Sequence, residues 1–144
     1  MSDAPIRFFP IDMKLAESVE PGGGVTVRMD GEETTLWFDL YGRQDAILQV
    51  FFANDCIVRI LDEMALSTES APERWAGLVP HHFAYRVEDD PFVDQQSETW
   101  RAVHEPFDHY VFHTDDSCVN ILSQNQPYFA LVLNAAVGDD KGHR

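Results

Sequence analysis

Three of the six histidines in this 144-residue chain fall within ten positions, in the run "HEPFDHYVFHTDDSC" at 104–118. Imidazole and thiolate groups are metal ligands and partners in nucleophilic catalysis, so this run is the first place to look for chemistry. His109 and His113 are four positions apart. On a helix they would lie one turn apart and could share a zinc ion. However, the tyrosine, valine and phenylalanine between them favour a strand.

A strand excludes the simplest metal site. Residues four apart on a strand face the same side but lie ~13 Å from each other, at ~3.3 Å per residue. Zinc holds its ligand atoms at ~2.1 Å, so two rings that far apart cannot share one ion. Position 111, where His-x-His spacing would need a second histidine, is valine. We therefore expect no metal on this strand and no cofactor.

A hairpin explains the same run better. If the turn has two residues, Asp115 and Asp116, then Phe112 opposes Val119. The resulting apolar face comprises Tyr110, Phe112, Val119 and Ile121. The other face carries the candidate polar cluster, which comprises His109, His113, Cys118 and Asn120. We predict that this second face is the wetter side of the hairpin.

This register also permits a sharper interpretation. His113 would face Cys118 with Cβ atoms ~5 Å apart. A neighbouring histidine can lower the pKa of a thiol and activate it, with His109 and Asn120 orienting the pair. The cluster could instead form one end of a cross-strand metal site. A shift of the turn by one residue would separate His113 from Cys118 and remove both alternatives.

The elements that would position these residues begin with a hairpin in "VTVRMDGEETTLWFDLY". Asp30-Gly31 suits a two-residue type I′ turn, which would place Arg28 opposite Glu33 and Val27 opposite Thr34. The predicted core face comprises Val25, Val27, Met29, Leu36, Phe38 and Leu40. Trp37 and Tyr41 then lie on the opposite face, where amphipathic aromatics are favoured at interfaces, so we name them as a candidate interface.

The middle of the chain predicts further strands and short helices. The apolar runs on either side of 53–55 predict a second hairpin near the centre of the fold. Ser70, Pro72 and Glu73 have the pattern of a capping box that opens a short helix. Residues 81–89 predict a strand, whereas 91–104 fit a helix or a strand, with the helix favoured. The last third resembles a meander that ends in the strand "PYFALVL".

These elements predict a mainly β (α+β) fold. About seven strands would form an antiparallel sheet in hairpins and a meander, sandwich-like or roll-like, with one or two short helices. The length suits one globular domain, which we assign to residues 1–137, and 138–144 is a polar tail expected to fray. Only two cysteines occur, Cys56 and Cys118, so no disulfide framework is expected.

The net charge of the chain limits the classes of partner that it is expected to bind. Twenty-five acidic residues against ten basic ones give a formal net charge of -15. Such a field repels nucleic acids and anionic membranes, and it would favour a basic protein partner. The N-terminal residues do not have the pattern of a signal peptide, and the apolar run at 128–133 is too short to span a membrane. Together these two observations predict a cytoplasmic location.

Two hypotheses for function remain. In the first, this acidic chain is a non-catalytic protein-interaction module. The net charge and the lack of a catalytic signature such as G-x-S-x-G or H-E-x-x-H favour this hypothesis. In the second, it is a ligand-binding, metal-binding or thiol-dependent β-fold with its site at His109, His113 and Cys118. Whether the chain is an enzyme stays open, with the first hypothesis favoured. An edge strand of the sheet could also support a homodimer.

Overall fold

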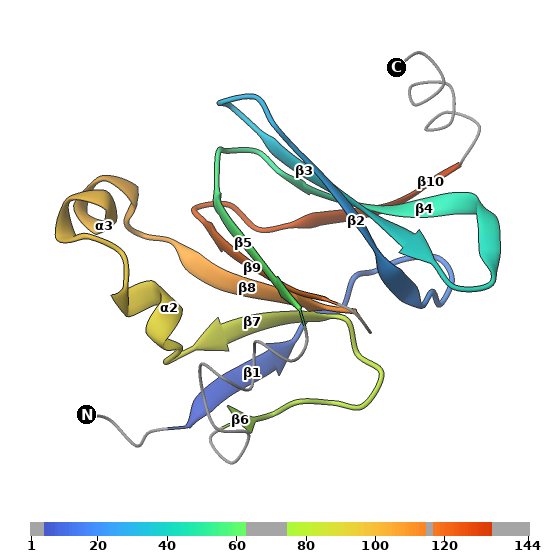
Figure 1. Cartoon of the computed structure of the whole chain (residues 1–144), viewed down its shortest axis with the longest axis horizontal. Coiled ribbons are helices and arrows are strands. Elements are labelled where there is room, and N and C mark those ends of the chain that lie inside the picture. Colours follow the sequence, from blue (N-terminus) through green and yellow to red (C-terminus); the bar gives the residue numbers. More distant parts are fainter. Residues whose placement is uncertain (1–4, 63–74, 115–116, 134–144) are drawn as a thin grey trace.

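The computed structural model describes residues 5–62, 75–114 and 117–133, and it contains two sheets (Figure 1). The six-stranded sheet has the strand order β5-β9-β8-β7-β1-β6, and the four-stranded sheet has the order β10-β4-β3-β2. The strands are β1 (Ile6–Pro10), β2 (Pro21–Met29), β3 (Thr34–Leu40), β4 (Arg43–Phe52), β5 (Ile57–Asp62), β6 (Trp75–Ala76), β7 (Ala84–Glu88), β8 (Asp108–His113), β9 (Ser117–Ser123) and β10 (Tyr128–Leu133). Among the described strands, β1 and β6 alone pair in parallel. The prediction of a mainly antiparallel, sandwich-like β fold is confirmed.

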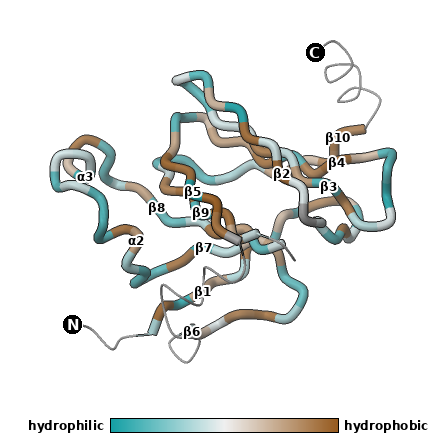
Figure 2. Tube along the Cα trace, viewed as in Figure 1, coloured by the Kyte–Doolittle hydropathy of each residue, from teal (hydrophilic) through white to brown (hydrophobic). Residues whose placement is uncertain are grey.

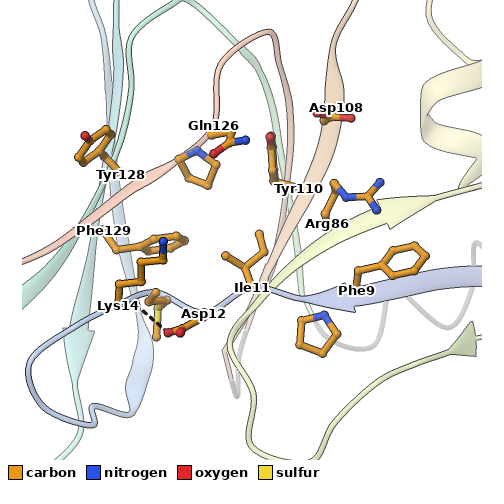
Figure 3. Close-up of a pocket in the computed structure, with 13 residues that line it drawn as sticks. Phe9, Ile11, Asp12, Lys14, Arg86, Asp108, Tyr110, Gln126, Tyr128 and Phe129 are labelled. Carbon is orange, nitrogen blue, oxygen red and sulfur yellow. Dashed lines mark hydrogen bonds between the residues drawn. The ribbon is translucent and has the colours of Figure 1, made fainter.

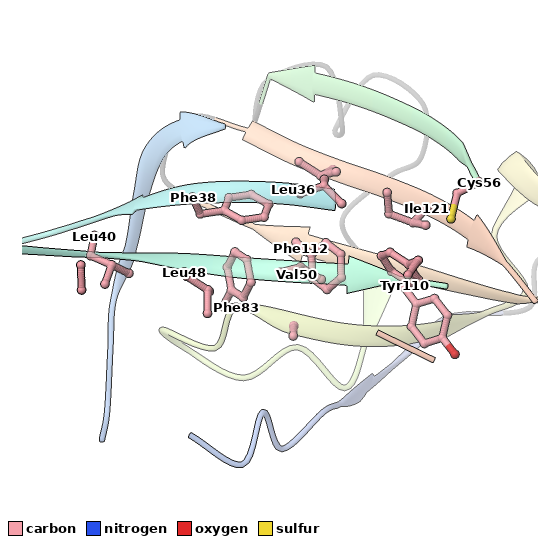
Figure 4. Close-up of a cluster of buried hydrophobic side chains, with 14 residues drawn as sticks. Leu36, Phe38, Leu40, Leu48, Val50, Cys56, Phe83, Tyr110, Phe112 and Ile121 are labelled. Atoms are coloured by element: carbon pink, nitrogen blue, oxygen red, sulfur yellow. The ribbon is translucent and has the colours of Figure 1, made fainter. Parts of the chain in front are cut away.

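The core lies between the two sheets and is built around one phenylalanine. Phe112 of β8 is fully buried, and its ring lies 6.1 Å from that of Phe38 and 6.3 Å from that of Phe52, both of the four-stranded sheet. It also stacks on Phe83 at 5.3 Å. Figure 4 shows side chains of β3 and β4 meeting those of β8 and β9 in this layer. Burying such aromatic surface is the main force that holds two sheets face to face.

The first hairpin forms, but its predicted register is wrong. Arg28 pairs with Thr35 rather than Glu33, and Val27 pairs with Leu36 rather than Thr34. The reason is the side chain of Asp30, which accepts the backbone N–H groups of Glu32 and Glu33 at 3.1 and 3.0 Å. These bonds favour a four-residue loop over the two-residue turn.

The predicted assignment of residues to the two faces of this hairpin still holds, because a register shift of two residues does not change the direction of the side chains. Leu36, Phe38 and Leu40 are buried on the predicted core face. Met29 was also assigned to the core, but it lies at the strand end and is 48% exposed. Figure 2 shows the hydrophilic tip of this hairpin beyond the apolar strands.

The second predicted hairpin is wrong. β4 turns back on β3 through residues 41–42, and β5 pairs with β9 at an edge of the six-stranded sheet, not at its centre. Residues 53–55 therefore carry the chain from one sheet to the other. Asn54 secures this crossing, because its backbone carbonyl accepts the Thr34 hydroxyl at 3.1 Å and its side-chain oxygen accepts the Ser123 hydroxyl at 2.9 Å.

The C-terminal meander is only partly confirmed. β8 and β9 pair as predicted, with Phe112 opposite Val119 and Tyr110 opposite Ile121. β10 then leaves this sheet and pairs with β4 along the other. The predicted strand at 81–89 is confirmed as β7.

The favoured prediction of helix at 91–104 is confirmed, because this segment forms the two short helices α2 (Pro91–Asp94) and α3 (Glu98–His104). Asp90 and Ser97 cap their N-termini by accepting the N–H groups of Phe92 and Trp100. Both helices lie at one end of the six-stranded sheet (Figure 1). Within the described ranges, none of the helices is long and apolar enough to cross a membrane. The predicted capping box at 70–73 and the tail at 138–144 lie outside the described residues.

Removing the central ring should weaken the contact between the sheets. We expect Phe112→Ala to lower the free energy of unfolding by roughly 3–5 kcal/mol, because it leaves a cavity among rings that cannot close around it. Urea denaturation followed by tryptophan fluorescence measures this change. Val103→Ala on α3, where the side chain is 69% exposed, is the matched control and should change stability by less than about 0.5 kcal/mol. Equal losses in the two variants would contradict the assignment of Phe112 to the core.

Candidate functional site

The structure brings the candidate polar cluster together. His113 lies directly opposite Cys118, which confirms the predicted adjacency. Nε2 of His109 lies 2.8 Å from Oδ1 of Asn120, and Nδ2 of Asn120 lies 3.7 Å from Sγ of Cys118. The four side chains share the outer face of the β8–β9 hairpin, which is the face turned away from the four-stranded sheet.

This face is not the wetter one, and that prediction is wrong. Cys118 and Asn120 are each 1% exposed, and His109 is 3% exposed. Phe92 of α2 covers His109 with ring centroids 5.4 Å apart. A second apolar cluster surrounds the rest of the face, comprising Ile6, Phe8, Tyr85, Val87, Val111 and Cys118. Along β8 and β9, the six-stranded sheet is thus buried on both faces.

Burial also sets the charge state of the histidines. Loss of solvent lowers the pKa of His109, and nearby Arg59 lowers it further, against the opposing effects of Asp90 and of the hydrogen bond to Asn120. Burial alone lowers the pKa of His113. Both rings are therefore neutral near pH 7. A neutral imidazole gives little electrostatic support to a thiolate, and a buried sulfur is closed to substrates.

The histidines and cysteines do not assemble a metal centre in the part of the chain that is described. There, no group of three or more histidine, cysteine, aspartate or glutamate side chains could hold an ion. Cys56 is buried as well, and burial raises the pKa of its thiol. Within the core, Asn120 is hydrogen-bonded to His109 and Cys118, whereas Nδ1 of His109 and Nε2 of His113 are buried without a hydrogen-bond partner among the described residues.

The candidate interface residue Trp37 lies on the outer face of the four-stranded sheet. It is half-buried, and its indole N–H donates to Oε1 of Gln49 on β4 at 3.0 Å. One row further along the strands, Thr35 pairs with Phe51, and Phe51 pairs with Tyr128 of β10. Tyr128 is 77% exposed. Aromatic side chains thus extend across this face from β3 to the edge strand β10.

A hollow of about 270 Å³ opens on this face. We call it the acidic hollow, and its lining comprises Arg28, Asp30, Glu33, Thr35, Trp37, Gln49 and Phe51. Hydrogen bonds from the backbone of Glu32 and Glu33 lower the pKa of Asp30, so its carboxyl group is ionised at neutral pH. Arg28 lowers that pKa further and balances one of the two acidic side chains.

Tyr41, the other candidate interface residue, lies elsewhere. It occupies the turn between β3 and β4 and is 48% exposed. Its backbone N–H donates to the carbonyl of Glu20 at 2.9 Å. The two residues are four apart in sequence, which corresponds to ~13 Å along a strand. Tyr41 could therefore contact a partner only at the margin of a surface centred on Trp37.

Most of the described arginines are already engaged with acidic side chains. The ion pairs join Arg7 to Glu88 and Asp89, Arg43 to Glu17 and Asp45, Arg86 to Glu88, and Arg101 to Asp94. Glu33 takes part in none of them. With a net charge of -15, the chain has far more acidic groups than its own cations can balance.

Sequence patterns indicated Trp37 but missed Phe51, Gln49 and Tyr128. Their place beside Trp37 depends on the pairing of β3 with β4 and of β4 with β10. The dipeptide Pro127-Tyr128 at the start of β10 was the only local signal in the sequence. In comparisons with known proteins, no family model matches the chain, and no curated protein or solved structure does either. Its function must therefore be inferred from the geometry of these surfaces.

The buried histidines should make stability depend on pH. Their pKa is lower in the folded state than the ~6.5 of an unfolded chain, so the unfolded state binds more protons below that value. Stability is then complete above pH ~6.5 and falls as the pH drops. Between pH 7.5 and 5.5 we therefore expect the free energy of unfolding to decrease, because both histidines take up protons more readily in the unfolded chain.

Urea denaturation at both pH values measures this loss. His113→Phe, which keeps a ring beside Phe8 and Tyr85, should remove about half of the pH dependence. Val103→Ala on α3, which removes no titratable group and alters an exposed side chain, is the control and should leave it unchanged. If His113→Phe unfolds with the same pH dependence as the original protein, burial of His113 does not control its protonation.

Burial also predicts inert thiols. In the folded protein at pH 7, we expect Cys56 and Cys118 to resist iodoacetamide, and both should react once urea unfolds the chain. Mass spectrometry of tryptic peptides measures the two sites separately. Rapid alkylation of Cys118 in the folded protein would instead support a thiol-dependent site at His113 and Cys118.

Proposed function

We propose that this chain is a non-catalytic protein-interaction module that binds a basic partner through the outer face of its four-stranded sheet. The acidic hollow beside Trp37 carries the proposal. It combines carboxylates with half-buried rings on an exposed sheet face. This combination suits an arginine or lysine side chain of a protein better than it suits an anion or a neutral metabolite.

The chemistry of the hollow matches a guanidinium group closely. Asp30 and Glu33 can accept its N–H groups, while Trp37 and Phe51 offer ring faces to a planar cation. Trp37 is held by its bond to Gln49, so little side-chain freedom is lost on binding. Tryptophan and arginine are also the residues that most often dominate binding energy at protein interfaces.

Charge complementarity supports a basic partner in particular. Arg28 neutralises only part of the hollow, and the chain as a whole carries a net charge of -15. Such a field speeds the approach of a positively charged protein and slows that of a negatively charged one. Tyr128 at the edge of the same face would add an exposed aromatic contact.

A tagged form of the whole chain, used to capture proteins from its source cells, tests this proposal. We expect one basic protein bound at a fixed stoichiometry, released as the salt concentration rises. With the purified partner, Trp37→Ala and Glu33→Gln should each weaken binding by about tenfold or more, since both remove part of the cation site. Calorimetric titration measures these affinities.

Two controls alter similar groups outside the hollow. Val103→Ala and Glu98→Gln on α3 should bind the partner like the original protein. Thermal unfolding of every variant shows that weaker binding does not reflect loss of the fold, and Glu33→Gln is the informative variant if Trp37→Ala unfolds. Binding that is insensitive to both hollow variants, or equally sensitive to both controls, would refute the proposal.

A further inference from the structure

The sandwich is open along one side, and a cleft of about 580 Å³ lies there (Figure 3). Strands β7 and β1 continue the six-stranded sheet beyond β8, whereas the four-stranded sheet stops at its edge strand β10. The cleft is lined by residues 9–14, by Arg86, Asp108 and Tyr110 of β7 and β8, and by residues 126–129. Its size falls within the range of ~300–1,000 Å³ that is common for small-molecule sites.

The centre of the cleft is apolar and aromatic. Ile11 and Phe129 are half-buried, and Tyr110 is only 3% exposed. Burial, with a smaller effect of Asp108, raises the pKa of Tyr110 to about 12, so its hydroxyl is neutral at physiological pH. Such walls can bury the hydrocarbon body of a ligand, and the phenol adds one neutral polar group.

Basic side chains lie on opposite sides of this apolar centre (Figure 3). Arg86 is already engaged, because it donates to Glu88 at 2.5 Å and lies 4.6 Å from the ring centroid of Phe9. Lys14 differs, since it forms no salt bridge with any other described residue. It is therefore an available cation in a chain of net charge -15.

The acidic residues of the cleft do not cancel this cation. Asp12 accepts the backbone N–H of Lys14 at 2.9 Å, which fixes the loop. In Figure 3 the side chain of Lys14 extends away from Asp12 and towards Phe129. Asp108 lies on the far side with Arg86. A ligand with one anionic end can thus place that end at Lys14 and its apolar body against Ile11 and Phe129.

We propose that this cleft binds a small amphipathic carboxylate, with its carboxylate at Lys14 and its apolar body between the sheets. The occupant is distinct from the basic protein partner proposed above, and so is its site. The two sites share only Tyr128, at the margin of each, and the residues that carry the two proposals differ, so either proposal can fail without the other.

Three probes that differ only in the head group test the proposal. They are 4-phenylbutanoate, 4-phenylbutanamide and 4-phenylbutylamine, titrated into the whole isotope-labelled protein and followed by NMR. We expect the carboxylate to shift the backbone amide signals of residues 11–14, 126, 128 and 129, and to bind about two- to fivefold more tightly than the amide, the range for an exposed ion pair. The amine should bind most weakly.

Lys14→Met should abolish the preference for the carboxylate while leaving the affinity for the amide unchanged. Arg28→Met removes a positive charge outside the cleft and should keep the preference, as should Trp37→Ala. The proposal is overturned if the amide or the amine binds as tightly as the carboxylate, if Lys14→Met keeps the preference, or if millimolar carboxylate shifts no signal at the cleft. An altered preference in Arg28→Met would show that net charge alone, and not Lys14, sets it.

Discussion

The packing of aromatic rings between the two sheets is the constraint on which the rest of this structure depends. Phe112 of the six-stranded sheet contacts the rings of Phe38 and Phe52 on the four-stranded sheet and of Phe83 just before β7, and the inner strands must align so that these rings interdigitate. This alignment determines which residues face outward. It places Trp37 beside Gln49 on one outer surface, and it brings His109, Asn120 and Cys118 onto the other. Both the proposed interaction face and the buried polar cluster are therefore consequences of how the core packs.

The outer faces of the two sheets differ in solvent exposure because other parts of the chain cover one of them and not the other. Along β8 and β9 the outer face of the six-stranded sheet is buried, in part beneath Phe92 of α2. There His109 bonds to Asn120, while Nε2 of His113 has no hydrogen-bond partner among the described residues. The outer face of the four-stranded sheet keeps Tyr128 largely exposed. The uncovered face therefore belongs to the four-stranded sheet, whereas the histidines and the cysteine of the polar cluster lie on the covered face of the other sheet.

The sequence was sufficient for local structure and insufficient for pairing between distant segments. The apolar patterns identified most of the strands but not β1 or β6, and they identified the core face of the first hairpin and the opposition of His113 and Cys118. It could not show that β4 and β5 belong to different sheets, because both have apolar residues on both faces. It also could not distinguish a solvated polar face from one whose polar groups bond to each other under α2.

The candidate sites show the same difference between what local sequence predicts and what depends on distant segments. Trp37 was accessible to sequence analysis because it belongs to a single hairpin. The cleft was not, since Lys14, Arg86 and Phe129 come from three distant segments that meet only where one sheet is wider than the other. Asp30 shows the local limit: its dipeptide with Gly31 is typical of a two-residue turn, yet its own carboxylate stabilised a longer loop.

The pairing of β4 with the C-terminal strand β10 has a consequence for folding during synthesis. β4 pairs with β3 on one side and with β10 on the other, and β10 is the last described strand to leave the ribosome. Until then β4 has an unpaired edge, and the apolar strand "AILQVFF" presents free backbone groups to other nascent chains. Completion of the four-stranded sheet therefore waits on the C-terminal part of the chain, which makes early release or truncation before residue 128 a route to aggregation.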